Sequence, residues 1–277
     1  MILALNIGNT HIALGIKENR IQGTLTLAHC KTKDHGNTDN IIRFLNKSLN
    51  AVQRKNISTV LVASVVPALN VKVKEAVQQA LGVSPCFVTK EAFDNLDFDY
   101  SKYDKTILGI DRLVTSYHVK NECLLPAVVI DFGTATTFNV IDEKGAFAGG
   151  IIIPGIFLWV RSLSDNTALI QNGSLASDLT ESVVGTSTTE CISIGALHGT
   201  GIMVDGFIKR IESQLDTTLK TVIATGGGAE HIMPYCKSIT ALNKELLLEG
   251  LFSIYENSHR DDADCHNEYH KDMEETK

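Results

Sequence analysis

Two short glycine turns carry the residue types best suited to binding an anion. The first reads Asn6-Ile-Gly-Asn-Thr10, and the second reads Asp131-Phe-Gly-Thr-Ala135. Each turn lies between two apolar runs, so each is expected to join a pair of strands. Glycine lets backbone N–H groups approach an anion without an intervening Cβ, and threonine hydroxyls add donors. The pair predicts a phosphate clamp, although one such turn alone also fits an ordinary hairpin.

A third glycine cluster, Thr225-Gly-Gly-Gly-Ala229, follows a predicted strand and precedes a predicted helix. Three consecutive glycines are costly in backbone entropy, so close approach of a ligand would explain them. A plain loop explains the segment equally well when it is considered alone.

One acidic residue is placed for acid–base chemistry. Asp111 lies in the tetrapeptide Gly109-Ile-Asp-Arg112. It could accept the proton of a substrate hydroxyl in phosphoryl transfer, and Arg112 could hold a carboxylate or phosphate. Taken alone, the tetrapeptide is better explained by an Asp–Arg pair at a helix N-terminus, where aspartate is favoured.

The elements that must position these residues follow from the period of the apolar residues, which alternates between strand-like and helix-like. The pattern predicts strands at residues 2–5, 12–16, 21–27, 58–66, 86–88, 127–130, 136–141, 148–153 and 221–224, and helices at 41–52, 71–81, 154–170, 188–215 and 244–255.

The two halves of this pattern match. Asn6 and Asp131 occupy equivalent positions, and a strand follows each turn. The repetition predicts duplicated α/β domains with a cleft between them, rather than one large mixed sheet with coincidental turns. We expect the domains at residues 1–118 and 119–256. Residues 257–277 are polar and are expected to be a disordered tail.

The composition excludes several classes of protein. The 277 residues are 44% hydrophobic, which allows a sizeable core, and the net charge of -7 does not favour nucleic acid or an anionic membrane. No membrane-length apolar run and no secretory signal are apparent. The six cysteines lack disulfide or zinc spacing, so we expect reduced thiols in a cytoplasmic protein.

The ordered series of motifs resembles the type III pantothenate kinases, a family of the actin-like, sugar-kinase and Hsp70-type ATPase superfamily. The resemblance extends from residue 1 to about residue 256. Each motif is short, but the complete series in this order is highly specific. Besides the segments above, it includes Ala63-Ser-Val-Val-Pro67, Gly149-Gly-Ile-Ile-Ile-Pro-Gly155, residues 162–169, Gly185…Thr188-Thr-Glu190 and Leu248-Glu-Gly-Leu251.

The resemblance implies a homodimer with two actin-like ATPase (ribonuclease H-like) domains. It implies ATP-dependent phosphorylation of pantothenate to 4′-phosphopantothenate, the first step of coenzyme A biosynthesis, with Asp111 as general base. Asp131 is implied to bind a monovalent cation, K⁺ or NH₄⁺, while Mg²⁺ accompanies ATP. The implied pantothenate-binding residues are Gly109, Ile110, Arg112, Thr188 and Tyr100 (or Tyr103), and the implied ATP-binding residues are Asn6, Ile7, Gly8, Asn9, Thr10, Gly133, Thr134, Gly226 and Gly227.

Asn6 departs from the family pattern, which has aspartate at this position. A neutral amide binds a hard cation more weakly than a carboxylate does. The alternative is therefore a weak or inactive paralogue that binds nucleotide or pantothenate in a regulatory role, although Asp111, Asp131 and Thr188 are retained. A kinase with another acceptor is a third hypothesis, motivated by the unusual segment near Tyr103.

Overall fold

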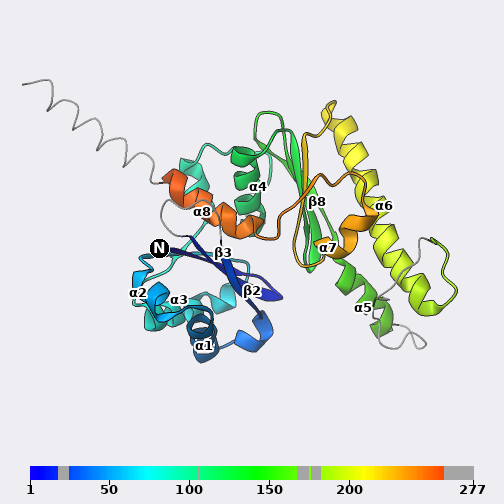
Figure 1. Ribbon diagram of the computed structural model, residues 1–277. Helices are drawn as coiled ribbons and strands as arrows, with labels where there is room; N and C mark the ends of the chain where they lie inside the picture. Colours follow the sequence, from blue (N-terminus) through cyan, green and yellow to red (C-terminus); the bar gives the residue numbers. More distant parts are fainter. Residues whose placement is uncertain (18–24, 105, 167–174, 176–181, 259–277) are drawn as a thin grey trace, which may run out of the picture. The chain divides into compact units, whose positions relative to one another are not determined.

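The computed structural model describes residues 1–17, 25–104, 106–166, 175 and 182–258, which form two compact units (Figure 1). Unit 1 contains residues 1–98, 106–118 and the segment from Glu245 onward, and unit 2 contains residues 99–104 and 119–244. The division falls within helix α4 (Ile110–Glu122), which is absent from the predicted helices. Polar residues such as Arg112, Thr115 and Ser116 are buried in α4, so the usual apolar periodicity is hidden.

Unit 1 is built on a five-stranded sheet of order β3-β2-β1-β4-β5. Strand β1 is antiparallel to β2 and parallel to β4, so the carboxyl ends of β1 and β4 lie at one edge. The strands are β1 (Ile2–Ile7), β2 (His11–Lys17), β3 (Leu25–Lys31), β4 (Thr59–Ser64) and β5 (Cys86–Phe87). The helices besides α4 are η1 (Thr32–His35), α1 (Thr38–Ser48), α2 (Ala51–Asn56), α3 (Pro67–Leu81), η2 (Lys90–Asn95) and α8 (Leu246–Ser258).

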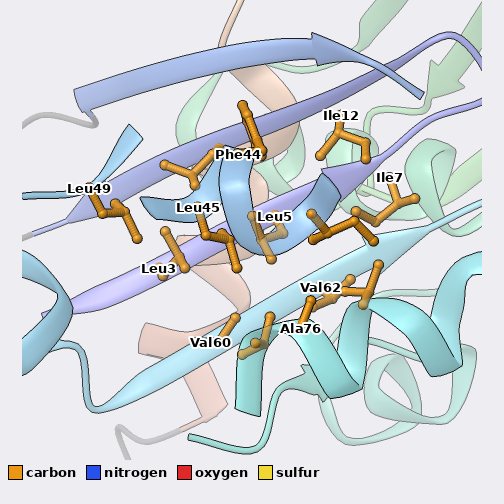
Figure 2. Close-up of a cluster of buried hydrophobic side chains, with 14 of the residues drawn as sticks. Leu3, Leu5, Ile7, Ile12, Phe44, Leu45, Leu49, Val60, Val62 and Ala76 are labelled. Carbon is orange, nitrogen blue, oxygen red and sulfur yellow. The ribbon is translucent and has the colours of Figure 1, made fainter. Parts of the chain in front are cut away.

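The core of unit 1 explains the apolar residues of β1. Leu3, Leu5 and Ile7 recur with the strand period and pack with Leu45 of α1 and Ala76 of α3 (Figure 2). The same strand also contacts α8. Burying each such leucine or isoleucine stabilises the fold by about 1.5–3 kcal/mol, so the carboxyl end of β1 is held in a rigid setting.

Unit 2 repeats this architecture. Its sheet has the order β10-β9-β6-β7-β8, with β6 antiparallel to β7 and parallel to β9, as β1 is to β2 and β4. The structure therefore confirms the predicted duplication. The strands are β6 (Ala127–Phe132), β7 (Ala135–Ile141), β8 (Phe147–Pro154), β9 (Thr221–Thr225) and β10 (Ala241–Leu242). The helices are α5 (Ile156–Asn166), α6 (Thr188–Leu215), α7 (Ala229–Ile232) and η3 (Met233–Tyr235).

Helix α6 has the predicted bounds. It is also apolar enough to resemble a membrane-spanning helix. Within the described parts of the chain, it alone has the length and composition of a membrane span. Ala196, Val204 and Ile208 of this helix pack into the core of unit 2. A core helix therefore accounts for the apolar sequence.

Several predicted boundaries reach outside the described residues. Part of the strand predicted at 21–27 and the end of the helix predicted at 154–170 lie there. Helix α8 continues through Ser258, and the rest of the predicted tail, residues 259–277, also lies outside the described residues.

Candidate active site

The first glycine turn is closed by its own backbone and anchored by a threonine at the start of η1. The Gly8 N–H donates to the carbonyl of His11 at 3.0 Å. Thr32, which is buried, donates its hydroxyl to the Gly8 carbonyl at 2.7 Å and its N–H to the Thr10 carbonyl at 2.9 Å. The glycine N–H therefore closes the turn, and Asn9 and Thr10 are exposed residues of it. No local sequence signal marks Thr32.

The two residues before this turn differ in the exposure of their side chains. The Ile7 side chain is buried in the core, whereas Asn6 is partly exposed. The Val65 N–H donates to the Ile7 carbonyl at 3.0 Å, and Asn6 lies opposite Ala63 in the parallel ladder. The motif that ends at Pro67 therefore lies beside the first turn, which the sequence order alone did not show.

The second turn and the glycine cluster lie side by side in unit 2. Asp131 on β6 pairs in register with Thr225 on β9, so both glycine segments leave the same sheet edge. Gly226 has φ +86°, and a Cβ there would collide with Asp131 Oδ1 and lie 2.8 Å from the Phe132 carbonyl carbon. The Gly228 N–H donates to the Phe132 carbonyl at 2.9 Å. The glycines thus let the backbone approach the Asp131 carboxylate directly.

The second turn is also closed by its own backbone. The Gly133 N–H donates to the Ala135 carbonyl at 3.1 Å, and the Gly155 N–H donates to the Thr134 carbonyl at 3.0 Å. Thr134 and Gly227 are exposed, and a Cβ added to Gly227 would meet no atom within 4 Å. As in unit 1, the glycine N–H closes the turn and the residue after the glycine is exposed.

Asp111 lies at the start of α4, where the sequence explains its geometry. Its Oδ1 accepts a hydrogen bond from the Arg112 N–H at 2.9 Å, and a Cβ on Gly109 would collide with that oxygen. Burial raises the pKa of the Asp111 carboxyl, and the N–H and guanidinium of Arg112 only partly oppose this shift. Arg112 and Ile110 are buried beside it. A partly buried carboxyl group with a raised pKa is suited to accept a proton.

Thr188 begins α6 and is exposed. Ser187 and Glu190 form a capping box, in which the Glu190 N–H donates to Ser187 Oγ at 3.2 Å. The Glu190 carboxylate accepts from the Thr186 N–H at 2.7 Å and from the Thr186 hydroxyl at 2.8 Å, and these bonds lower the pKa of Glu190. The cap accounts for the motif around Thr188 and leaves its hydroxyl at the surface.

The two candidate tyrosines lie in the segment 99–104 of unit 2. Tyr100 is buried, with 3% of its surface exposed, whereas Tyr103 packs edge-to-face on Phe147 with ring centroids 5.5 Å apart. The Phe147 N–H donates to the carbonyl of Asp99 at 2.7 Å. The segment is therefore attached to the start of β8.

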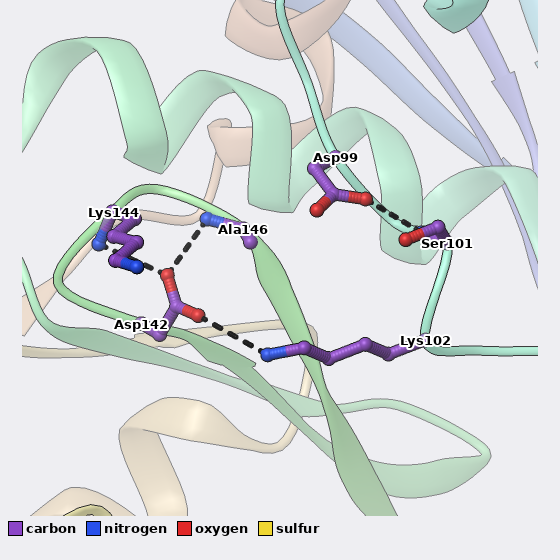
Figure 3. Close-up of polar contacts among 6 residues, drawn as sticks. All are labelled: Asp99, Ser101, Lys102, Asp142, Lys144 and Ala146. Atoms are coloured by element: carbon purple, nitrogen blue, oxygen red, sulfur yellow. Dashed lines mark hydrogen bonds and ion pairs between the residues drawn. The ribbon is translucent and has the colours of Figure 1, made fainter.

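Asp142 strengthens this attachment (Figure 3). Its Oδ1 accepts from the N–H groups of Lys144 at 3.0 Å and Ala146 at 2.9 Å, which shapes the turn between β7 and β8. Its Oδ2 lies 3.8 Å from Lys102 Nζ, and the Asp99 carboxylate accepts from the Ser101 N–H. The tyrosine segment and the hairpin thus form one local structure.

Comparison with solved structures defines the fold class. A Campylobacter jejuni protein described as a Baf family transcriptional activator has a TM-score of 0.57 at 20% identity, covering 92% of this chain and 98% of that chain. The activator of the 2-hydroxyisocaproyl-CoA dehydratase from Clostridium difficile, solved with bound ADPNP, has a TM-score of 0.50 at 14% identity, covering 95% and 97%. Two matching sheets of this topology define the actin-like ATPase (ribonuclease H-like) fold, as predicted.

Sequence comparison then identifies the family. A family model described as type III pantothenate kinase matches residues 2–210. A type III pantothenate kinase from Anaeromyxobacter dehalogenans is 33% identical over 92% of this chain and 99% of that protein, and one from Exiguobacterium is 32% identical over 94% and 100%. The chain therefore belongs to the type III pantothenate kinase family.

Proposed function

We propose that this protein transfers the γ-phosphoryl group of ATP to the hydroxyl group of pantothenate, which yields 4′-phosphopantothenate and starts coenzyme A biosynthesis. Family membership over nearly the whole chain carries this conclusion. The carboxyl group at the start of α4, with its raised pKa, supplies the acceptor for the hydroxyl proton.

Asp111 acts as the general base in this reaction. Its carboxylate takes the hydroxyl proton as the substrate oxygen bonds to the γ-phosphorus and the bond to the bridging oxygen of ADP breaks. Lack of a side chain at Gly109 leaves room for this carboxylate. Arg112 binds the pantothenate carboxylate, and Gly109, Ile110, Thr188 and Tyr100 make the remaining contacts with pantothenate.

ATP contacts the exposed residues of the two turns. Asn9, Thr10 and Thr134 bind phosphate oxygens, with Gly8 and Gly133 shaping the turns through their closing hydrogen bonds. Gly226 and Gly227 contact the adenosine, where the lack of side chains allows close approach. The arrangement of Asn6 and Ile7 at the end of β1 positions the first turn.

Cations neutralise charge in this proposal. Mg²⁺ accompanies ATP, since it commonly binds substrate phosphates, waters and only one or two carboxylates. Asp131, whose carboxylate lies against a glycine backbone, holds K⁺ or NH₄⁺. Activity should fall when Na⁺ replaces K⁺ at matched ionic strength.

The decisive experiment incubates the purified protein with ATP, Mg²⁺, K⁺ and pantothenate. We expect ADP and 4′-phosphopantothenate in equal amounts, quantified by mass spectrometry. Nucleotide binding without turnover would instead support the regulatory paralogue. Turnover with another hydroxyl compound but not with pantothenate would support a kinase with a changed acceptor.

The protein is further proposed to be a cytoplasmic homodimer that binds neither nucleic acid nor membrane. The exposed apolar side chains of Phe157, Trp159 and Ile202 on α5 and α6 support a protein–protein contact on unit 2. Light scattering should give twice the chain mass at assay concentrations. A fully active monomer would contradict the dimer.

A further inference from the structure

The motif Leu248-Glu-Gly-Leu251 lies in α8, far along the chain from Asp111, yet it packs directly on the helix that carries this residue. A Cβ on Gly250 would lie 2.6 Å from the Val114 carbonyl oxygen and 2.7 Å from Val114 Cγ1. Contacts this short require one of the two backbones to move. Only glycine therefore allows α8 to lie this close to α4.

Side chains on both sides of Gly250 secure the same contact. Glu249 Oε2 lies 3.4 Å from His118 Nε2, and Ser253 Oγ lies 2.8 Å from His118 Nδ1. One turn further, Asn257 Nδ2 donates to Tyr117 Oη at 2.7 Å. Helix α8 thus holds α4 by a backbone approach and by polar bonds along its length.

The order Ser253–His118–Glu249 is also that of a nucleophile, base and acid. Ser253 is buried in the interior of α8, with 9% of its surface exposed. A substrate carbonyl could not reach its hydroxyl, so the contact geometry favours a structural role for the three residues.

Helix α8 is itself held by the sheet of unit 1. Glu256 Oε1 lies 2.6 Å from Lys17 Nζ on β2, and the same ammonium group lies 5.9 Å from the centroid of the Phe252 ring. Leu248 and Leu251 are buried, and α8 contacts β1, β2 and β4. The position of α8 is therefore set by the strands that also carry the first glycine turn.

Asp111, Val114 and His118 recur at helical spacing and share one face of α4. Two of these three residues contact α8. We propose that Gly250 and Glu249 are positioning residues for the Asp111 carboxylate, because they set the location and rotation of α4. This inference rests on the proposed function, in which Asp111 is the base.

The principal test is Gly250→Ala in the full-length protein. The added Cβ must displace α4, and we expect kcat to fall by between about 10-fold and 100-fold, the scale of a small misplacement of a catalytic group. The KM for ATP should change little. If water reaches the displaced carboxyl group, its raised pKa should fall, and the acid limb of the kcat–pH profile should move to lower pH.

A second pair of variants keeps the test independent of folding. Glu249→Gln retains the size of the side chain but removes its charge beside His118, and we expect kcat to fall about 3-fold to 10-fold, within the range found for misplaced catalytic groups. Ser258→Ala is the control, because it lies on the same helix and its hydroxyl donates to the Ile254 carbonyl within that helix. It should leave kcat and the pH profile unchanged.

The outcomes distinguish failure of the positioning role from failure of the proposed function. Wild-type kcat and pH profile in both Gly250→Ala and Glu249→Gln would overturn the positioning role, even if both variants unfold at lower temperature. If Gly250→Ala does not fold, equal kcat in Glu249→Gln and Ser258→Ala would overturn it. Retention of activity by Asp111→Asn would instead remove the base from the proposed function and would overturn the inference with it.

Discussion

The two sheets have the same strand order, but the loops that follow their equivalent strands β4 and β9 differ in their residues. In unit 1, the loop after β4 carries side chains, and Ser64 Oγ donates to Asn70 Oδ1 at 2.6 Å and accepts from the Val66 N–H at 3.2 Å. In unit 2, the equivalent loop after β9 begins with three glycines, of which Gly226 lies against the carboxylate of Asp131. Side-chain hydrogen bonds hold the loop of unit 1, whereas in unit 2 a glycine backbone without side chains lies beside the Asp131 carboxylate.

The first-turn residues differ in the same way. Asn6 and Asp131 occupy equivalent strand ends, but only Asp131 brings a carboxylate. Unit 1 adds its acidic group elsewhere, at the start of α4, where burial raises the pKa of Asp111. The framework is therefore repeated, whereas the acidic groups lie at different places in the two units. In the proposed function, unit 1 supplies the base and unit 2 supplies the close backbone contact.

The largest expected effect tests the role of unit 1. Asp111→Asn should lower kcat by about 10²-fold to 10⁴-fold, the usual scale for loss of a general base. The Kd for ATP, measured by calorimetry, should stay within a few-fold of wild type, because the glycine turns are untouched. Near-normal turnover would show that unit 1 does not supply the base.

The next effect tests the bare backbone of unit 2. Gly226→Ala would place a side chain at φ +86° and against Asp131 and Phe132, so it should cost about 1–3 kcal/mol. We expect a lower melting temperature and an ATP Kd weakened by about tenfold, which corresponds to about 1.4 kcal/mol. Gly206→Ala on α6 is the control, since nothing lies within 4 Å of its added Cβ and the residue has no proposed contact with ATP. Equal losses in both variants would refute this account of Gly226.

The third prediction tests whether the lack of a carboxylate at Asn6 in unit 1 raises the Mg²⁺ requirement or slows turnover. Asn6→Asp restores a charged oxygen at the end of β1, and a charge-assisted contact is worth about 1–3 kcal/mol, or roughly tenfold or more in rate. The variant should need less Mg²⁺ or turn over faster in a Mg²⁺ titration. An unchanged titration with a fully active wild type would show that the amide is sufficient.

A smaller effect concerns the anchoring of the first turn. Thr32→Val removes the hydroxyl that donates to Gly8, and it should lower the free energy of unfolding by about 0.5–1.5 kcal/mol. Thr38→Val, which loses an exposed bond to Glu75, should cost less and serves as the control. Urea unfolding would measure both, and a larger loss at Thr38 would contradict the importance assigned to Thr32.

The smallest expected effect is a rise in melting temperature when Asp111 is replaced by asparagine. Because the native pKa of Asp111 is raised, the unfolded state binds fewer protons than the native state as pH rises from the usual value of 3.8 through the native pKa. The charged carboxylate therefore destabilises the fold above that range. Asp111→Asn should melt at a higher temperature than wild type at pH 8, and the difference should shrink as pH falls through the range. A lower melting temperature at pH 8 would contradict this sign.

Much of the molecule follows from local sequence. The glycine turns, the equivalence of Asn6 and Asp131 and the bounds of α6 were predictable, because strand period, helix period and capping residues act over a few neighbours. The ordered motifs also predicted the family, since their types and sequence are visible without coordinates.

Tertiary structure alone decided how distant residues complete these elements. Thr32 anchors the turn at Gly8, and Gly250 is required by the backbone of Val114, although neither residue carries a local signal for its partner. Beyond an N-terminus near Asp111, the course of helix α4 escaped prediction because Arg112 and other polar residues are buried on it by the surrounding packing. Such contacts depend on which surfaces meet after folding, and the pattern of a single segment does not contain that information.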